Sequence, residues 1–248
     1  MRFDGRNPRA ESFLKRESSR LITDIVEDTR KAIRTVLELD MAAGRGPRAT
    51  ALDIVGRVNR ATGRREGGLI GLTEGDMQAT RNALAQLRSG QPGQMRAFMR
   101  RAGVTKREMA LVQSYIRDKK PVPADIARKL VGRYSDNLLK LRGETIARTE
   151  LLGSLHHAQD EGLQQLVDAG KLRNDQITEE WDASEDGDTR DSHAAVNGTK
   201  IKRGELFIVG GYQMSGPGDR SHGAPAKEII SCRCRKRISI NFLADLAL

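Results

Sequence analysis

The side chains best suited to chemistry lie after residue 180 of this 248-residue chain. That region holds both cysteines, the only tryptophan and two of the four histidines. Thiolates and imidazoles are the usual ligands of zinc, which proteins bind in a tetrahedral arrangement. Cys232 and Cys234, together with His193 and His222, therefore form a candidate Cys2His2 site, and zinc is the candidate cofactor.

The spacing of Cys232 and Cys234 limits how the two thiols can be used. If the segment is an extended strand, residues two apart lie on the same face. Their Cβ atoms are then too far apart for an easy disulfide, which needs a separation of about 4 Å. A C-x-C motif indicates zinc less strongly than C-x-x-C, and buried free cysteines behave as small apolar residues. Zinc ligation and simple burial are both open at this point.

Carboxylates gather just before His193, at Asp186, Asp188 and Asp191. Carboxylates and imidazoles hold divalent metals in nucleases and phosphatases when they converge on one open site. The alternative is structural: Asp188 caps a short helix that follows it, while Arg190 and His193 hydrogen-bond neighbouring strands. We favour the structural interpretation, because closeness in sequence does not bring side chains to one site.

The elements that must position these residues begin with a series of predicted helices. Apolar residues recur at three- and four-residue steps through most of the chain before residue 170, as in amphipathic helices. Thr105 and Glu108 have the spacing of a capping box, and Thr73 can cap another helix. Helices are expected over 8–43, 47–61, 74–89, 105–118 and 124–170, with a flexible connection over 62–75.

The longest of these helices carries glycines and a histidine pair. Gly132, Gly143 and Gly153 are candidate points at which it kinks or divides. His156 and His157 are adjacent, so they point about 100° apart and cannot both serve one site from that helix. We expect them to be ordinary helix residues.

After residue 170 the pattern changes to short extended segments separated by glycine, proline and polar turns. Strands are expected over 177–181, 199–202, 206–209 and 229–240. The predicted class is α+β, with a helical N-terminal domain and a long helix that leads into a small mixed α/β C-terminal domain. The expected divisions are 1–120 for the helical region, 121–172 for the connector and 173–248 for the C-terminal domain.

Charge is distributed unevenly along the chain. Residues 1–150 contain 31 Lys and Arg against 18 Asp and Glu, whereas residues 151–248 contain 12 against 15. A basic body could neutralise the phosphates of a nucleic acid. The alternative is that a long helical surface needs charge for solubility. Composition alone does not decide between them.

The sequence favours a cytoplasmic protein. It has no apolar run approaching the roughly eighteen residues that cross a bilayer, and its N-terminus lacks the apolar stretch of a secretory signal. Two cysteines in a C-x-C motif do not form a disulfide framework, which agrees with a reducing compartment. No membrane association is expected.

Taken together and in order, the unusual residues resemble the C-terminal domain of the phage Mu F-like head morphogenesis family, whose members are also called minor head proteins. Upstream, residues 146–150 (IARTE) are similar to a segment that precedes this domain on a long helix, and the resemblance covers roughly residues 130–237. One departure is Ser231, where the family commonly has asparagine before the C-x-C motif. The residues that carry the resemblance are Trp181, Asp188, Arg190, His193, Gly198, Phe207, Pro217, Asp219, Glu228, Cys232 and Cys234.

This resemblance implies a non-enzymatic virion component of a tailed phage or prophage. Such a protein is made in the host cytoplasm, acts in head assembly at the portal vertex and resides in the head interior or at that vertex. The implied partners are the portal protein, the major capsid or scaffold proteins and, without sequence specificity, double-stranded DNA. Candidate DNA contacts are Arg57, Arg60, Arg64, Arg65, Arg100, Arg101, Lys106, Arg107, Lys119 and Lys120. The alternative is a metal-dependent nuclease or hydrolase that uses Asp186, Asp188, His193 and the two cysteines.

Overall fold

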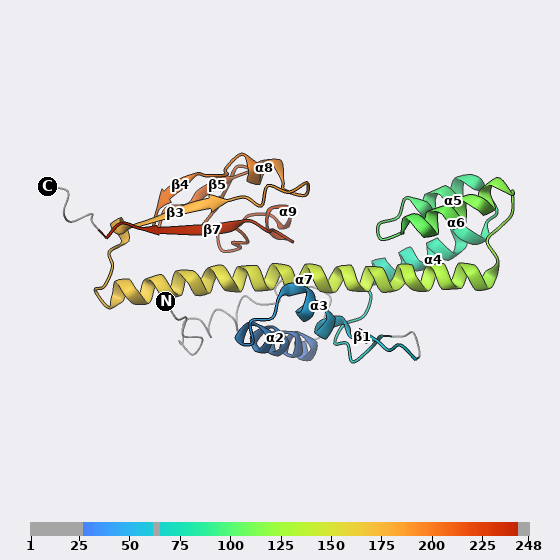
Figure 1. Ribbon diagram of the computed structural model, residues 1–248, viewed down its shortest axis with the longest axis horizontal. Coiled ribbons are helices and arrows are strands. Elements are labelled where there is room, and N and C mark those ends of the chain that lie inside the picture. Colours follow the sequence, from blue (N-terminus) through green and yellow to red (C-terminus); the bar gives the residue numbers. More distant parts are fainter. Residues whose placement is uncertain (1–26, 62–64, 243–248) are drawn as a thin grey trace. The chain divides into compact units, whose positions relative to one another are not determined.

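The computed structural model describes residues 27–61 and 65–242, and its chain divides into two compact units (Figure 1). The helical unit is formed mainly by Ala51–Glu144. The α+β unit is formed mainly by Arg30–Thr50 and by the residues from Thr145 onward. The predicted α+β class is confirmed, because helices predominate in the described chain up to residue 168 and small sheets follow.

The helical unit packs several short helices and the first part of the long helix α7 (Ala124–Asp168) around one apolar core. Leu87, Met95, Phe98, Val112 and Leu130 are fully buried in that core. Burial of one such side chain stabilises a fold by about 1.5–3 kcal/mol. The elements before residue 118 are α2 (Glu27–Ala42), α3 (Pro47–Val55), β1 (Arg57–Val58), β2 (Arg65–Glu66), α4 (Glu74–Arg88), α5 (Pro92–Met99) and α6 (Lys106–Arg117).

Two of these helices begin at the threonines that the sequence marks as caps. The Thr105 hydroxyl accepts a hydrogen bond from the Glu108 amide, and the Glu108 carboxylate accepts one from the Thr105 amide. Thr73 and Asp76 form the same reciprocal box at the start of α4. Each box satisfies amides that a helix start leaves unpaired, which stabilises the helix by about 1 kcal/mol. Both predicted helix starts are confirmed.

The predicted helix over 47–61 is too long. α3 ends at Val55, and Gly56 follows with φ +81°, where an added Cβ would lie 2.5 Å from the Glu66 carbonyl oxygen. Arg57 and Val58 then form β1, which pairs with β2. The strand β2 lies inside the segment that was expected to be a flexible connection. The part of the first predicted helix that precedes residue 27 lies outside the described residues.

Two other segments differ from the prediction. Proline suits the first turn of a helix as well as the end of one, and Pro92 begins α5, which the sequence interpretation lacks. The predicted strand over 229–240 is instead α9 (Ala226–Ile229), a loop and β7 (Arg235–Ile240). Cys232 and Cys234 lie in that loop and not in a strand.

The predicted long helix is confirmed as α7 (Ala124–Asp168), a single helix of 45 residues. It continues through Gly132, Gly143 and Gly153, although each glycine costs about 1 kcal/mol relative to alanine. Packing requires glycine at position 143, because an added Cβ would lie 2.4 Å from Cγ1 of Val55. Among the described residues, α7 included, no helix is both long and apolar enough to cross a membrane.

Beyond α7 the chain forms small antiparallel sheets. β3 (Ile177–Asp182) is the central strand of a three-stranded sheet, between β4 (Lys200–Lys202) and β7. Side chains alternate along β3, so that Ile177, Glu179 and Trp181 are buried. The remaining elements are η1 (Asn174–Gln176), α8 (Asp191–Ala194) and the hairpin of β5 (Phe207–Val209) and β6 (Tyr212–Met214).

Candidate metal centre

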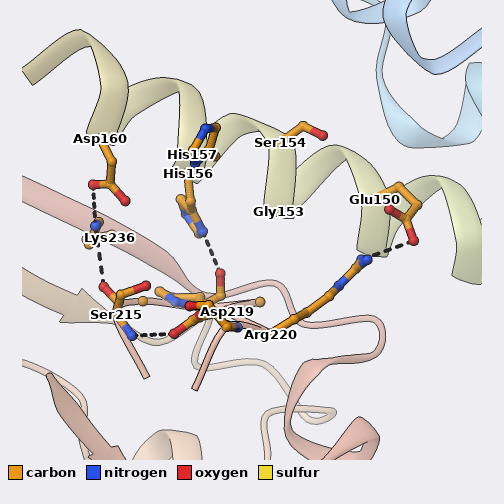
Figure 2. A pocket seen from close by; sticks show the side chains of 14 residues that line it. Glu150, Gly153, Ser154, His156, His157, Asp160, Ser215, Asp219, Arg220 and Lys236 are labelled. Atoms are coloured by element: carbon orange, nitrogen blue, oxygen red, sulfur yellow. Dashed lines mark hydrogen bonds and ion pairs between the residues drawn. The ribbon is translucent and has the colours of Figure 1, made fainter. Parts of the chain in front are cut away.

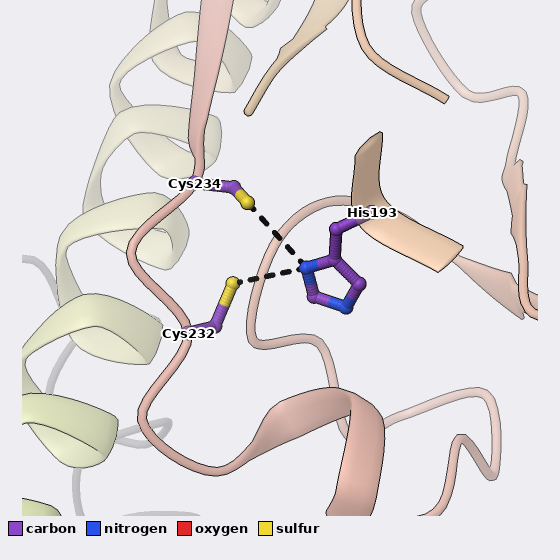
Figure 3. A group of neighbouring side chains, drawn as sticks. All are labelled: His193, Cys232 and Cys234. Carbon is purple, nitrogen blue, oxygen red and sulfur yellow. Dashed lines mark hydrogen bonds between the residues drawn. The ribbon is translucent and has the colours of Figure 1, made fainter. Parts of the chain in front are cut away.

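His193, Cys232 and Cys234 meet in the core of the α+β unit (Figure 3). α8 carries the histidine, and the loop between α9 and β7 carries both cysteines. Nδ1 of His193 lies 3.5 Å from Sγ of Cys232 and 3.4 Å from Sγ of Cys234. All three side chains are buried, with at most 2% of each residue exposed.

These distances suit a tetrahedral metal ion. Zinc lies about 2.3 Å from thiolate sulfur and about 2.0 Å from imidazole nitrogen, which places such ligand atoms about 3.6 Å from each other. The three ligand atoms here lie within 4.8 Å of one another. The group could therefore bind a metal, as the sequence predicts for these three residues.

The two cysteines differ in their affinity for protons. A hydrogen bond with Cys232 lowers the pKa of the Cys234 thiol well below its ordinary value despite burial. The same hydrogen bond to Cys234, together with burial, raises the pKa of Cys232. Metal binding requires both cysteines to lose their protons, and the lowered pKa of Cys234 favours this at one of the two sulfurs.

The other ring nitrogen of His193 faces a carboxylate. Its Nε2 lies 3.2 Å from Oε2 of Glu228, although the two are not aligned as a hydrogen bond. Glu228 is only 4% exposed, and its Oε2 accepts a hydrogen bond of 2.7 Å from the Ser192 hydroxyl. A carboxylate against the non-ligating nitrogen is the usual support of a metal-bound histidine.

Aromatic rings enclose the imidazole. Trp181 meets His193 edge to face at a centroid distance of 5.3 Å, and it meets Phe207 at 5.4 Å. The indole Nε1 of Trp181 is buried and has no hydrogen-bond partner among the described residues. Exclusion of water around a charged group strengthens its interactions with nearby ligands.

The predicted fourth ligand, His222, is wrong. Its Nδ1 lies 2.6 Å from Oδ2 of Asp219 and 2.9 Å from the Ser221 hydroxyl. It is an exposed residue, and within the described part of the chain only His193 and the two cysteines form the group. His222 bonds Asp219 and not the metal group, because Asp219 and His222 lie on one tight turn.

The acidic residues considered as an alternative metal site do not assemble with His193. Asp186 and Asp188 both pair with Arg233, at 2.8 and 3.1 Å, and the Asp188 side chain is 83% exposed. Asp191 is also exposed. In the described residues, no group of three potential ligands includes any of these carboxylates. Of the residues named for a hydrolase, His193 and the two cysteines therefore share a site in the described structure, and Asp186 and Asp188 do not join it.

The structural role expected of Asp188 is also wrong. The N-cap of α8 is Arg190, which makes no side-chain capping bond, and Asp188 is not a cap. Arg190 instead donates a hydrogen bond of 2.5 Å to the carbonyl oxygen of Ile230, after α9. It therefore fixes the loop that carries Cys232, and it does not bond a strand as expected.

The segment upstream of this domain attaches directly to it. The Ser231 amide donates to the Thr149 hydroxyl at 2.9 Å, and Arg220 pairs with Glu150 at 3.0 Å. Thr149 and Glu150 belong to the IARTE segment on α7. The loop that holds the cysteines is thus bonded to α7 immediately beside Cys232.

A pocket of about 320 Å³ lies between the C-terminal half of α7 and the turn at residues 215–221 (Figure 2). His156 points from α7 toward this turn and donates through Nδ1 to the Pro217 carbonyl at 2.6 Å. Burial lowers the pKa of His156 by more than this hydrogen bond raises it, which favours the neutral ring. The expectation that His156 is an ordinary helix residue is wrong.

Lys236 closes one end of this pocket. Its ammonium group, with 2% of the side chain exposed, lies 2.5 Å from Asp160 and 3.2 Å from Glu179. Burial raises the pKa of Glu179, against the opposing effect of Lys236. Sequence reasoning missed this network. The available signal was the helical spacing of Gly153, His156 and Asp160, which places them on one face of α7.

The remaining residues of the resemblance shape turns around the site. Gly198 has φ +74°, a conformation that favours glycine, and its amide donates to the Trp181 carbonyl at 2.8 Å. Asp219 accepts hydrogen bonds from the amides of Ser215 and Ser221, at 2.7 and 2.8 Å. Both residues therefore fix backbone geometry, and neither approaches the metal group as a ligand.

The candidate DNA contacts fall into three groups. Arg65 is wrong as a DNA contact, because it is only 11% exposed and binds Asp136 through two nitrogens. Arg101 is partly buried, donates to Gln86 and stacks on Tyr134, and it stays a prediction as a DNA contact. Arg64 lies outside the described residues. The exposed members are Arg57, Arg60, Arg100, Lys106, Arg107, Lys119 and Lys120.

No protein-family model, curated protein or solved structure matches this chain.

Proposed function

We propose that this chain is a minor head protein of a tailed phage or prophage that acts in head assembly at the portal vertex. The proposal rests on the resemblance to the Mu F-like family, and it assigns no enzymatic activity to the chain. The partners that it names are the portal protein, the major capsid or scaffold proteins and packaged DNA. The host cytoplasm is then the place of synthesis, and the virion is the destination.

The observation that carries this proposal is the convergence of the residues that define the resemblance. Trp181, His193 and Phe207 come from separate elements, and Cys232 and Cys234 come from one loop, yet the five residues form a single buried group. Residues whose order matched the family by chance would not be expected to contact one another in the fold. Their convergence supports treating them as one domain signature.

The contacts of α7 support the same interpretation. Thr149 and Glu150 bond residues that lie 82 and 70 positions later, at Ser231 and Arg220. The upstream segment and the C-terminal domain of the resemblance are therefore parts of one packed unit. A long helix joined to a compact domain in this way suits a protein that connects assembly partners.

The ion that we assign to the metal group is zinc. Two cysteine sulfurs and one imidazole nitrogen favour zinc over calcium or magnesium, which prefer oxygen ligands. Here zinc would hold the loop before β7 against α8 and would carry out no reaction. Elemental analysis of the purified full chain should find about one zinc per chain, and Cys232→Ser/Cys234→Ser should lack it. Equal zinc in both proteins would contradict this assignment.

Particle composition tests the head function. If the proposal is correct, mass spectrometry of purified virions from a lysogen that encodes this chain will detect it at a few copies per particle. Deletion of its gene should reduce the yield of DNA-filled heads. Comparison of intact with DNA-emptied particles separates an ejected protein from a retained one. Absence of the chain from both proheads and virions would overturn the proposal.

A further inference from the structure

Glu228 is buried in the same place as the metal group, and its surroundings are unusual for a carboxylate. It is 4% exposed and lies at the third position of the short helix α9. Its Oε2 is 2.7 Å from the Ser192 hydroxyl and 3.2 Å from Nε2 of His193. Burial of a carboxylate is costly unless donors compensate it. The Ser192 hydroxyl donates a hydrogen bond to this carboxylate, and Nε2 of His193 lies within ion-pair distance of it.

The fold leaves space for this carboxylate. Gly210, in the turn between β5 and β6, has φ +57°. An added Cβ at that position would lie 3.0 Å from Oε1 of Glu228 and 3.3 Å from its Cδ. The hairpin therefore covers the carboxylate closely and limits its movement. Lys227 approaches only to 3.9 Å and is 70% exposed, so a surface charge contributes little.

The two ring nitrogens of His193 have different surroundings. Nδ1 faces two sulfur atoms at 3.4 and 3.5 Å, and all three atoms are electron-rich. Nε2 faces a carboxylate, which accepts hydrogen bonds and cannot donate them when ionised. The arrangement is satisfied when Nε2 carries the proton and Nδ1 presents its lone pair to a cation that also binds both sulfurs.

We propose that Glu228 is the positioning residue of the metal site: it holds the proton of His193 on Nε2 and so presents Nδ1 as the ligating nitrogen. This inference rests on the assignment of zinc to the group formed by His193, Cys232 and Cys234. Glu228 acts through the histidine and does not touch the ion. Ser192 in turn holds the carboxylate, so α8 supplies both the ligand and the hydroxyl that orients its support.

Zinc affinity of the full chain tests this role. Glu228→Gln keeps the size of the side chain but removes its charge, and supports of this kind change metal affinity by about 10- to 100-fold. Competition with a chromophoric chelator should therefore show zinc binding weakened by at least about tenfold. Lys227→Gln, which removes a neighbouring exposed charge, is the matched control and should bind zinc as the unsubstituted chain does.

A double-mutant cycle separates positioning from general destabilisation. In a His193→Ala background the same Glu228→Gln change should have no further effect on zinc affinity, because the residue through which it acts is absent. Cobalt-substituted Glu228→Gln should keep the thiolate-to-metal absorption band, since both sulfur ligands remain. If Glu228→Gln does not fold, Ser192→Ala should give a smaller loss of affinity in the same direction.

Each alternative outcome overturns a distinct statement. Unchanged affinity in Glu228→Gln, or an equal loss in the His193→Ala background, overturns the positioning role alone. An unsubstituted chain that binds no zinc overturns both the zinc assignment and the positioning role. The head function is decided separately, by the composition of purified particles.

Discussion

Ser231 adopts a left-handed backbone conformation, with φ +55°. This region costs an ordinary L-residue about 1–2 kcal/mol, whereas asparagine tolerates it better. The geometry gives a physical reason for the asparagine that the resembled family commonly has at this place. The Thr149 hydroxyl, which accepts from the Ser231 amide at 2.9 Å, helps to hold the strained residue. Ser231 thus stores strain directly beside Cys232.

We expect Ser231→Asn to stabilise the chain by about 0.5–1 kcal/mol, because it lowers the cost of the left-handed conformation. Urea denaturation followed by circular dichroism measures this change in the free energy of unfolding. Ser114→Asn is the control, since Ser114 lies in the right-handed backbone of α6 and should gain nothing. Equal effects at the two positions would argue against backbone strain as the cause.

Asp219 should make stability depend on pH. Burial raises its pKa, but hydrogen bonds from Ser221, Ser215 and His222 outweigh burial and lower the pKa overall. Because the pKa of Asp219 is lower in the folded chain than in the unfolded chain, where it is near 3.9, the charged carboxylate stabilises the fold above that pH. This stabilisation is lost as pH falls through the pKa of the folded chain. Asp219→Asn should therefore cost about 1–3 kcal/mol at pH 7.

The difference between Asp219→Asn and the unsubstituted chain should shrink as pH falls from about 5 to 3, where Asp219 of the unfolded chain takes up a proton, and it should disappear below the lowered pKa of the native aspartate. Urea midpoints measured across this range provide the test. Asp118→Asn, at a carboxylate with a side chain that is 57% exposed, should show a small and nearly constant difference. A constant cost at position 219 across the range would contradict the role given to its charge.

At the scale of elements, the glycines of α7 have different physical meanings. An added Cβ at Gly143 would lie 2.4 Å from Cγ1 of buried Val55 and 3.2 Å from the Ala51 carbonyl. At Gly132 no atom lies within 4 Å of such a Cβ in the described structure. Gly143 therefore permits close approach of α3, whereas Gly132 only weakens the helix.

Alanine substitutions at these glycines should have opposite signs. Gly143→Ala overpacks the contact with α3 and should destabilise the chain by about 1–3 kcal/mol. Gly132→Ala improves helix propensity in open space and should stabilise it by up to about 1 kcal/mol. Thermal or urea unfolding of the two variants gives the comparison. Stabilisation at both positions would show that α3 does not pack on Gly143 as described.

Local signals predicted most helices, and tertiary contacts explain the differences. The boxes at Thr73 and Thr105 act within four residues, so sequence reveals them. The end of α3 depends on pairing of Arg57 with Glu66, which periodicity does not show. The role of His156 depends on Pro217, 61 positions later.

The metal group shows the same limit. Its residue types indicated zinc, and three of the four predicted ligands meet. His222 was as plausible from the sequence as His193. Only the fold shows that His222 bonds Asp219 within a turn, whereas α8 places His193 beside the cysteines.

At the scale of the whole molecule, charge and chemistry are divided between the units. Residues 51–144, which form most of the helical unit, contain 19 Lys and Arg against 9 Asp and Glu. The metal group and the residues of the resemblance lie in the α+β unit. If the chain binds packaged DNA, the helical unit should supply the affinity, and the α+β unit should be available for protein partners.

DNA affinity of the full chain should then fall steeply with salt, because each neutralised phosphate releases condensed counterions. Combined alanine substitution of the exposed Lys106, Arg107, Lys119 and Lys120 should weaken binding and reduce the slope of log affinity against log salt. Loss of four contacts would lower that slope by about 3.6. Fluorescence anisotropy with a labelled duplex, between about 50 and 200 mM salt, measures both quantities.

The matched control removes an equal number of exposed cations from the α+β unit, at Lys171, Lys200, Lys202 and Lys227. Both variants lose the same net charge, so a difference between them reports where the duplex lies and not how basic the chain is. The control should keep most of the affinity and nearly the full salt slope. Equal losses in the two variants would indicate diffuse attraction to the whole chain, and affinity that is flat with salt would remove DNA from its partners.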